Sequence, residues 1–571
     1  MRLTQTAIAL ALALLATVPV RAEETADAGA YLAARTAAIE ADFAAAADWH
    51  ARALRADPDN LQLLDGAMRS EMALGRFDRA QVLAGKLAAL GERNQMAALA
   101  EMTAEAAKGE FAAMIKARAD GRSVAQLLDN LVGAWAEAGD GRMSDALAAL
   151  DKIAGAKAPE AIFGAYHKAL ALASVGDFEG ADRIFADPAN AGLLTLRRAV
   201  LAHLQVLSQL ERGPEALALL DKTYPKGADA GLDALRSRLE SGEMLPWDVV
   251  TTPQQGVAEV LYTLATVLNG QADDSYTLVH ARAALFLRPD HVEAALMAGG
   301  LLNAQGQHDL AVETYAVIPP TAPEFYMAEI GRADTLADSG KPDAAIEVMQ
   351  ALSKAYPGLF IVQRSYGDAL RRQERFEDAT RAYDAAIALI GTPQVQDWPI
   401  FFSRGICHER QKRHEQAEAD MRKALELSPD QPQVLNYLGY NFLELNKNLD
   451  EALEMIQRAV ALEPDSGAIT DSLAWAYFRL GRYDDAVAPM ERASMLEPVD
   501  PVVTDHLGDV YWAVGRKLEA RFQWRRALSF SPEEKEAERI RRKLEVGLDA
   551  VLAAEGAPSL EAVKNAAADN N

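Results

Sequence analysis

The 571-residue sequence has little of what disulfide-linked, zinc-binding or nucleic-acid-binding proteins depend on. Cysteine occurs once, at Cys407, so no intramolecular disulfide can form and no cysteine cluster can bind zinc. We interpret Cys407 as a packing residue of a helix. Lysine and arginine number 58 against 83 Asp and Glu, and the resulting net charge of −25 argues against nucleic-acid partners and anionic membranes.

The sequence also lacks recognisable catalytic motifs. It has no phosphate loop with Gly-Lys-Ser/Thr, no Gly-x-Ser-x-Gly elbow and no dinucleotide-binding glycine pattern. The segment that starts at His414 resembles a zinc-protease helix only until its last place, which is Glu418 instead of histidine. We therefore predict no enzyme activity, no cofactor and no metal.

The N-terminus is typical of a secretory signal peptide. Arg2 supplies a positive start, Ala7–Val18 is an apolar core, and Val20 and Ala22 are small residues before a cleavage site. We predict a signal peptide over residues 1–22, with no lipid-attachment cysteine beside it. No later stretch is long and apolar enough to predict a transmembrane anchor. We expect an exported protein, most simply in a bacterial periplasm.

One pattern occurs twice within residues 467–534, displaced by 34 positions. Small, aromatic and proline residues hold the same places in both copies: Leu473, Ala474, Tyr477, Gly481, Ala486, Met490, Ala493 and Pro498, then Leu507, Gly508, Tyr511, Gly515, Ala520, Trp524, Ala527 and Pro532. The spacing predicts two helices, with a glycine after the first and small residues where the two cross.

This pattern resembles the tetratricopeptide repeat, a helix–turn–helix unit of 34 residues. The resemblance implies an all-α fold, an α-solenoid superhelix of tandem repeats. The period returns in the prolines 289, 323 and 357 and in the small residues Ala311, Ala345 and Ala379. It is looser before residue 224 and breaks near Trp247, in a stretch rich in proline and β-branched residues.

The predicted organisation follows these changes of period. It comprises a signal peptide (1–22), a degenerate helical array (23–223), an irregular crossing segment (224–256), a regular array (257–532), a capping helix (533–551) and a disordered tail (552–571). A flexible hinge is the alternative for residues 224–256.

In the repeat family, the first helices line a concave groove, and the resemblance places one stripe of each helix in it. Over the last three repeats, the candidate protein-binding residues are Asn436, Tyr440, Asp471, Trp475, Phe478, Arg479, Asp505, Asp509 and Trp512. Aromatic side chains supply contact area, and the Asp residues would favour Lys or Arg in a ligand. The alternative is that the tryptophans pack between repeats.

The predicted function is a non-enzymatic periplasmic scaffold or adaptor that binds protein or peptide partners in its groove. The blocks that start at Asp471 and Asp505 also resemble bacterial envelope repeat proteins, such as the lipoprotein adaptor of a carboxyl-terminal processing protease. An assembly factor of an outer-membrane or polysaccharide-export complex is the alternative. A basic patch is interpreted as solvated charge, with a surface for an acidic ligand or for internal ion pairs as the alternative: Arg364, Arg371, Arg372, Arg375 and Arg381.

Overall fold

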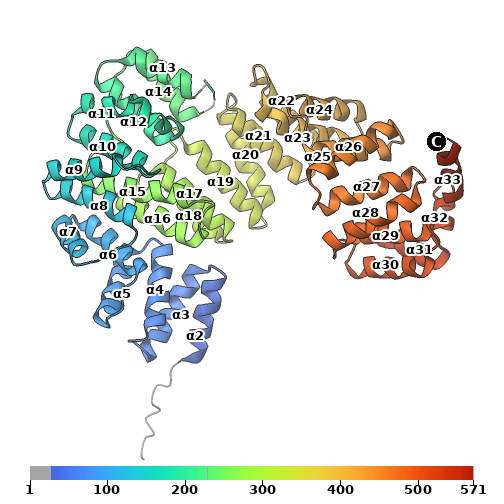
Figure 1. The fold of residues 1–571 in the computed structure, drawn as a ribbon, viewed down its shortest axis with the longest axis horizontal. Coiled ribbons are helices and arrows are strands. Elements are labelled where there is room, and N and C mark those ends of the chain that lie inside the picture. Colours follow the sequence, from blue (N-terminus) through green and yellow to red (C-terminus); the bar gives the residue numbers. More distant parts are fainter. Residues whose placement is uncertain (1–26, 225, 228, 570–571) are drawn as a thin grey trace, which may run out of the picture. The chain divides into compact units, whose positions relative to one another are not determined.

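The structure is a computed structural model that describes residues 27–569, except residues 225 and 228. The predicted signal peptide lies outside the described residues. Within them the chain forms helices and no strand, most of them in antiparallel pairs, which confirms the all-α solenoid (Figure 1). None of these helices combines the length and the apolar composition that crossing a membrane requires.

The chain divides into two compact units, and we describe each by itself. Unit 1 is Met1–Ser365 and unit 2 is Tyr366–Asn571.

The helices of unit 1 begin with α2 and end with α20. They are α2 (Ala28–Ile39), α3 (Phe43–Ala56), α4 (Leu61–Ala73), α5 (Phe77–Ala89), α6 (Gln95–Lys108), α7 (Phe111–Ala119), α8 (Gln126–Gly139), α9 (Met143–Ala154), α10 (Ala161–Ser174), α11 (Phe178–Phe185), η1 (Pro188–Thr195), α12 (Arg197–Gln209), α13 (Gly213–Thr223), α14 (Ala230–Glu240), α15 (Pro253–Leu268), α16 (Asp274–Leu287), α17 (Val292–Ala304), α18 (His308–Tyr315), α19 (Phe325–Asp338) and α20 (Pro342–Ala355).

The next helix, α21 (Phe360–Arg372), contains the division between the units, and the remaining helices belong to unit 2. They are α22 (Phe376–Ala388), η2 (Val395–Asp397), α23 (Trp398–Arg410), α24 (His414–Leu427), α25 (Pro432–Glu444), α26 (Leu449–Leu462), α27 (Gly467–Arg479), α28 (Tyr483–Leu496), α29 (Pro501–Ala513), α30 (Lys517–Ser529), α31 (Glu534–Val546), α32 (Leu548–Ala554) and α33 (Leu560–Asp569).

Small residues set the packing of each helix pair in unit 2. Ala486 and Ala493 of α28 are fully buried, at the places where the sequence predicts that two helices cross. Gly508 of α29 lies so close to α30 that an added Cβ atom would stand 2.4 Å from the Trp524 ring. A larger side chain at such places would force the pair apart.

The segment between α14 and α15, in unit 1, is extended and partly buried. Leu245 and Val250 are fully buried, and the Trp247 indole donates a hydrogen bond to the Val250 carbonyl oxygen at 2.7 Å. The Trp247 ring packs edge-on against Phe178, with 6.3 Å between the ring centroids. These contacts hold the segment against helix α11, whereas a flexible hinge would need no such contacts.

A buried network of charges joins helices of unit 1 that are far apart in the sequence. Arg197, at the start of α12, forms ion pairs with Asp229, Glu293 and Glu324 at 2.6, 2.9 and 2.7 Å. Arg198 pairs with Glu259 at 2.6 Å and with Glu293 at 3.3 Å. Burial disfavours the charge of Arg198, but Glu259 and Glu293 outweigh this and raise its pKa.

The C-terminal end differs from the predicted disordered tail. Helix α32 continues to Ala554, and a further helix, α33, covers Leu560–Asp569. Ser559 precedes α33, and its side-chain oxygen accepts a hydrogen bond from the Ala562 amide at 3.2 Å. Alanine has a high helix propensity, but a segment this short is stable as a helix only when it packs against apolar residues.

Candidate functional site

The predicted groove residues lie on the first helices of three consecutive repeats in unit 2. Helix α25 carries Asn436 and Tyr440, α27 carries Asp471, Trp475, Phe478 and Arg479, and α29 carries Asp505, Asp509 and Trp512. Their environments differ because the C-terminal helices cover part of this surface.

Helix α31 covers the predicted groove at the last repeat. The Lys543 side chain is fully buried, and its Nζ atom lies 2.7 Å from Asp505 Oδ2 and 2.7 Å from both Asp509 oxygens. Asp509 also accepts a hydrogen bond from the Trp524 indole at 2.9 Å. Burial in this apolar setting outweighs the attraction of Lys543 and raises the pKa of Asp509.

Helix α32 completes the cover. The Trp512 indole donates a hydrogen bond to Asp549 Oδ2 at 2.8 Å, and Trp512 is buried. The structure therefore corrects the expectation of an open groove at Asp505, Asp509 and Trp512. Because a solenoid must cover the apolar face of its last repeat, the chain uses these residues to bind its own cap.

The residues of α27 form an aromatic stack. The Trp475 ring lies nearly parallel to Phe478, at 4.8 Å between centroids, and nearly parallel to His506 of α29, at 4.0 Å. His506 Nδ1 lies 3.0 Å from Asp471 Oδ1. Burial disfavours the imidazolium, but the charge of Asp471, with smaller contributions from Asp505 and Asp509, outweighs it and raises the pKa of His506.

Next to this stack is a cavity of about 1130 Å³. One wall is formed by Trp475, Phe478 and Arg479 of α27. The other walls come from α26, the α27–α28 turn and the C-terminal helices, and they include Leu449, Leu453, Tyr483, Arg539, Leu548, Leu552, Leu560 and Val563. The volume is slightly above the roughly 300–1,000 Å³ that is usual for ligand-binding cavities.

The lining of the cavity combines apolar side chains with charged ones, and several of the charged side chains have ion-pair partners. Arg479 Nη1 forms an ion pair with Glu444 at 3.1 Å, and Arg539 Nε forms one with Glu555 at 2.9 Å. Asp509 reaches the cavity as well, but it is already bound to Lys543. Since these charges have partners, the apolar walls are the part of the cavity with contact area to offer a ligand.

The structure therefore brings together Trp475, Phe478, Arg479 and Asp509. The other five predicted residues are outside the lining of the cavity. Among the nine predicted residues, the Trp475 Nε1 donor and the Asn436 and Asp505 Oδ1 acceptors are buried without a hydrogen-bond partner. Burial, then the charges of Glu444 and Asp471, raises the pKa of Tyr440, which keeps its hydroxyl neutral.

Sequence reasoning missed the half of the cavity that the C-terminal helices supply. The sequence predicted a capping helix over residues 533–551 without assigning its inner face, which is a buried stripe of Ala537, Ile540 and Lys543 at spacings of three residues. That spacing is the signal that could have placed Lys543 on the inner face. In α33, the stripe of Leu560, Val563 and Ala566 is too weak among the neighbouring alanines to have indicated cavity residues.

The other candidates identified from the sequence have structural partners. Cys407 is fully buried, and burial raises the pKa of its thiol to about 12, so it remains a neutral packing residue. In the basic patch, Arg375 pairs with Asp378 at 2.7 Å and Arg381 with Glu377 at 3.1 Å. Across the part of the chain that the structure describes, no group of three or more His, Cys, Asp or Glu side chains could hold a metal ion.

Three family models, each described as a tetratricopeptide repeat, match unit 2 and the end of unit 1. They cover residues 280–324 and 330–394, residues 398–431, and residues 443–505. A TPR repeat-containing protein of Pseudomonas aeruginosa is 27% identical over 191 residues, which is 33% of this chain. The match spans 31% of the length of that relative.

Two solved structures are similar at low identity. The APC/C hetero-tetramer Cut9–Hcn1 has a TM-score of 0.40 and 15% identity, over 90% of this chain and 95% of that one. A tetratricopeptide repeat protein from Parabacteroides merdae has a TM-score of 0.37 and 16% identity, over 45% of this chain and 98% of that one.

Tandem repeats of this kind present extended concave surfaces and act as scaffolds for protein–protein interaction. The helix pairs, their 34-residue period and the matched repeat models agree. The chain contains tetratricopeptide repeats, which the family models match over residues 280–324, 330–394, 398–431 and 443–505.

Proposed function

We propose that this protein is an exported, non-enzymatic scaffold that binds a segment of a partner protein in the cavity beside α27. The observation that carries the proposal is the cavity itself, where Trp475 and Phe478 of the repeat array meet Leu548 and Leu552 of the cap. Aromatic and aliphatic side chains around a sheltered space are typical of the energetically dominant centre of a protein interface.

The ion pairs around the cavity change the expected ligand, because the sequence alone favoured a ligand with Lys or Arg. Asp505 and Asp509 are both bound to the buried Lys543, so they are not available to a Lys or Arg of the ligand. Arg479 and Arg539 have carboxylate partners of their own. We therefore propose a ligand that binds mainly through apolar side chains, against the apolar residues of the lining.

The bacterial periplasm is part of the proposal and rests on the signal-peptide pattern of residues 1–22. Mass spectrometry of the mature chain tests it. Export with cleavage after Ala22 leaves Glu23 as the first residue, whereas a chain that starts at Met1 in the cytoplasmic fraction would contradict it.

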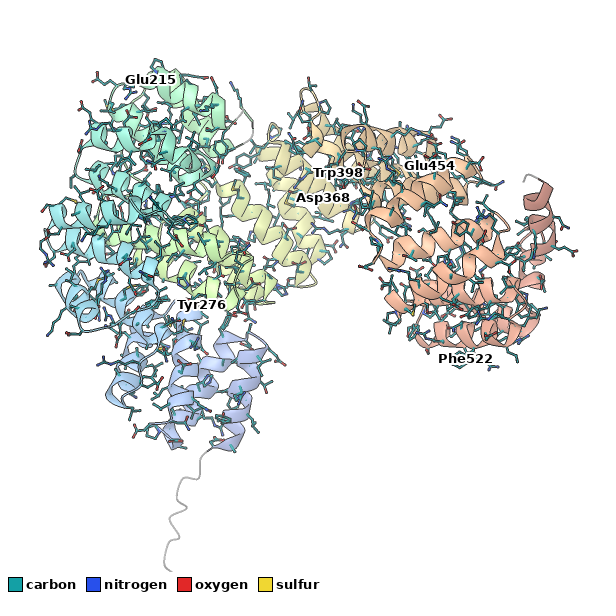
Figure 2. All side chains as sticks on the ribbon, viewed as in Figure 1. Glu215, Tyr276, Asp368, Trp398, Glu454 and Phe522 are labelled. Atoms are coloured by element: carbon teal, nitrogen blue, oxygen red, sulfur yellow. The ribbon has the colours of Figure 1, made fainter. Side chains whose placement is uncertain are left out.

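Photo-crosslinking in cells tests the binding site. A photoreactive amino acid at position 479 lies in the cavity wall, and the same residue at position 522 is the matched control. Phe522 projects from the outer helix α30 and is 65% exposed (Figure 2). We expect a partner captured from position 479 only, with capture reduced in the Trp475→Ala variant.

The identity of the captured protein separates the two roles. A protease together with its substrates would support the adaptor, and a stoichiometric envelope-assembly component would support the assembly factor. The same set of proteins from positions 479 and 522, or none from position 479, would refute the cavity as the binding site.

A further inference from the structure

The last helix, α33, is held far more loosely than the two helices before it. Of its described side chains, over residues 560–566, Leu560 and Val563 are half-buried and the others are exposed. By contrast, α31 buries Ile540 and Lys543, and α32 buries Leu548. A segment with few buried contacts opens at a small fraction of the free energy of global unfolding.

The attachment of α33 is mostly to the α27–α28 turn. The Tyr483 hydroxyl donates a hydrogen bond to the Leu560 carbonyl oxygen at 2.9 Å. An added Cβ atom on Gly481 would stand 2.7 Å from the Val563 carbonyl oxygen, so the two backbones nearly touch. The Lys564–Asp484 ion pair is 4.0 Å long and exposed on both sides, so it adds little.

A short connection joins α33 to the cap. It contains Gly556, which has a φ of +73° and ends α32, and Pro558, which cannot extend a helix. Movement of α33 about this connection would leave the Lys543 contacts of α31 in place.

The side of α33 that faces the cavity has the pattern of a bound amphipathic helix. Leu560, Val563 and Ala566 all line the cavity, at spacings of three residues that fall on one stripe. They share the cavity with Phe478 and Trp475, the residues to which the proposed function assigns partner binding.

From these contacts we infer that α33 is an internal ligand of the cavity, and that the partner segment is a short amphipathic helix that displaces it. The inference rests on the proposed function for the identity of the site, and it adds the class of ligand and its competitor. The partner segment has apolar residues at positions i and i+3, which match Leu560 and Val563. It binds in the cavity once α33 has moved away.

Hydrogen exchange of the full chain, without any ligand, tests the release of α33. We expect the amides of residues 560–566 to exchange at least about 100-fold faster than those of α31, because local opening suffices to expose them. Equal protection of α31 and α33 would show that α33 is a fixed part of the cap and would overturn the inference.

A synthetic peptide of residues 556–571, labelled with a fluorophore, tests the competition. It is titrated against the full chain and against a full-length Leu560→Asp/Val563→Asp variant, whose own α33 no longer fits the cavity. If α33 is docked in about nine of ten wild-type molecules, the peptide binds the wild type about tenfold more weakly than the variant. The control peptide carries the same two substitutions and should not bind.

Two further measurements keep the test decisive. Circular dichroism of the variant should match the wild type, since the substituted residues are only half-buried. Adding Phe478→Ala to the variant should weaken peptide binding, because Phe478 is a wall of the cavity. Equal affinity for wild type and variant, or no binding to either, would overturn the inference.

These results are independent of the cellular partner. Peptide binding without any partner captured from position 479 would leave the internal ligand established and refute the proposed function. A partner captured from position 479, together with equal peptide affinity for wild type and variant, would support the proposed function and refute the internal ligand.

Discussion

Replacing Lys543 with Met tests whether a buried ion pair holds the cap on unit 2. The Lys543 side chain is 0% exposed and binds two carboxylates of α29, Asp505 and Asp509, at 2.7 Å. Met has a similar length and an apolar end, so the substitution removes the charge and changes the packed volume little. Two buried carboxylates are then left without their cation.

The expected loss is about 3–5 kcal/mol in the free energy of unfolding of unit 2, the usual cost of breaking a buried pair from one side. Only a minor part of this loss comes from packing, because Met keeps most of the contacts that the Lys543 stem makes. Arg539 Nη1, 3.7 Å from Asp509 Oδ2, moderates the loss because it stays near the carboxylates.

The loss should depend on pH, and its sign follows from the pKa of Asp509. That pKa is already raised in the folded chain because burial outweighs Lys543, and removal of Lys543 raises it further. A carboxyl group with a raised pKa in the folded state binds a proton more readily there than in the unfolded chain. Stability of the variant therefore recovers as the pH falls through the raised pKa.

Urea denaturation followed by tryptophan fluorescence measures the effect, because Trp512 and Trp524 lie beside the cap. Hydrogen exchange of α31 assigns the loss to this part of the chain. Lys535→Met is the matched control on the exposed face of the same helix and should change little. A Lys543→Met variant as stable as this control at neutral pH would refute the buried-pair argument.

Three other predictions concern both units. Ala486→Leu should destabilise unit 2 by about 1–3 kcal/mol through overpacking, whereas Ala488→Leu on the exposed side of α28 should not, as thermal unfolding would show. The raised pKa of His506 means that its contribution to stability is complete below about pH 6.5 and lost as the pH rises through its folded pKa; His506→Gln should flatten this part of a stability–pH curve. Arg198→Met should cost unit 1 about 3–5 kcal/mol by removing the arginine that balances the buried Glu259 carboxylate, measured by hydrogen exchange of α15.

The repeat architecture could be predicted from the sequence because its determinants are local. A small residue at a helix crossing, such as Ala486, and a glycine after a helix, such as Gly481, fix the pair within one 34-residue unit. Each unit then packs against its neighbours in the same way. The 34-residue period therefore predicts the same helix pair in each successive repeat.

The C-terminal half of the cavity could not be predicted, since it depends on contacts between distant residues. Lys543 looked like one more solvated charge of α31 because its partners, Asp505 and Asp509, lie 38 and 34 residues away. The short helix α33 has only a weak pattern of its own. Its position is set by Tyr483, which lies 77 residues from Leu560.

Trp475 and Trp512 show why a place in the repeat does not by itself define a binding residue. Both lie on the predicted inner stripe, yet Trp512 donates to Asp549 of the cap, while Trp475 lines the cavity and keeps an unpartnered indole donor. The difference comes from position in the array. The last repeat must bind its own cap to cover its apolar face. The binding surface therefore begins one repeat earlier, where α33 lines the cavity and is held by few contacts.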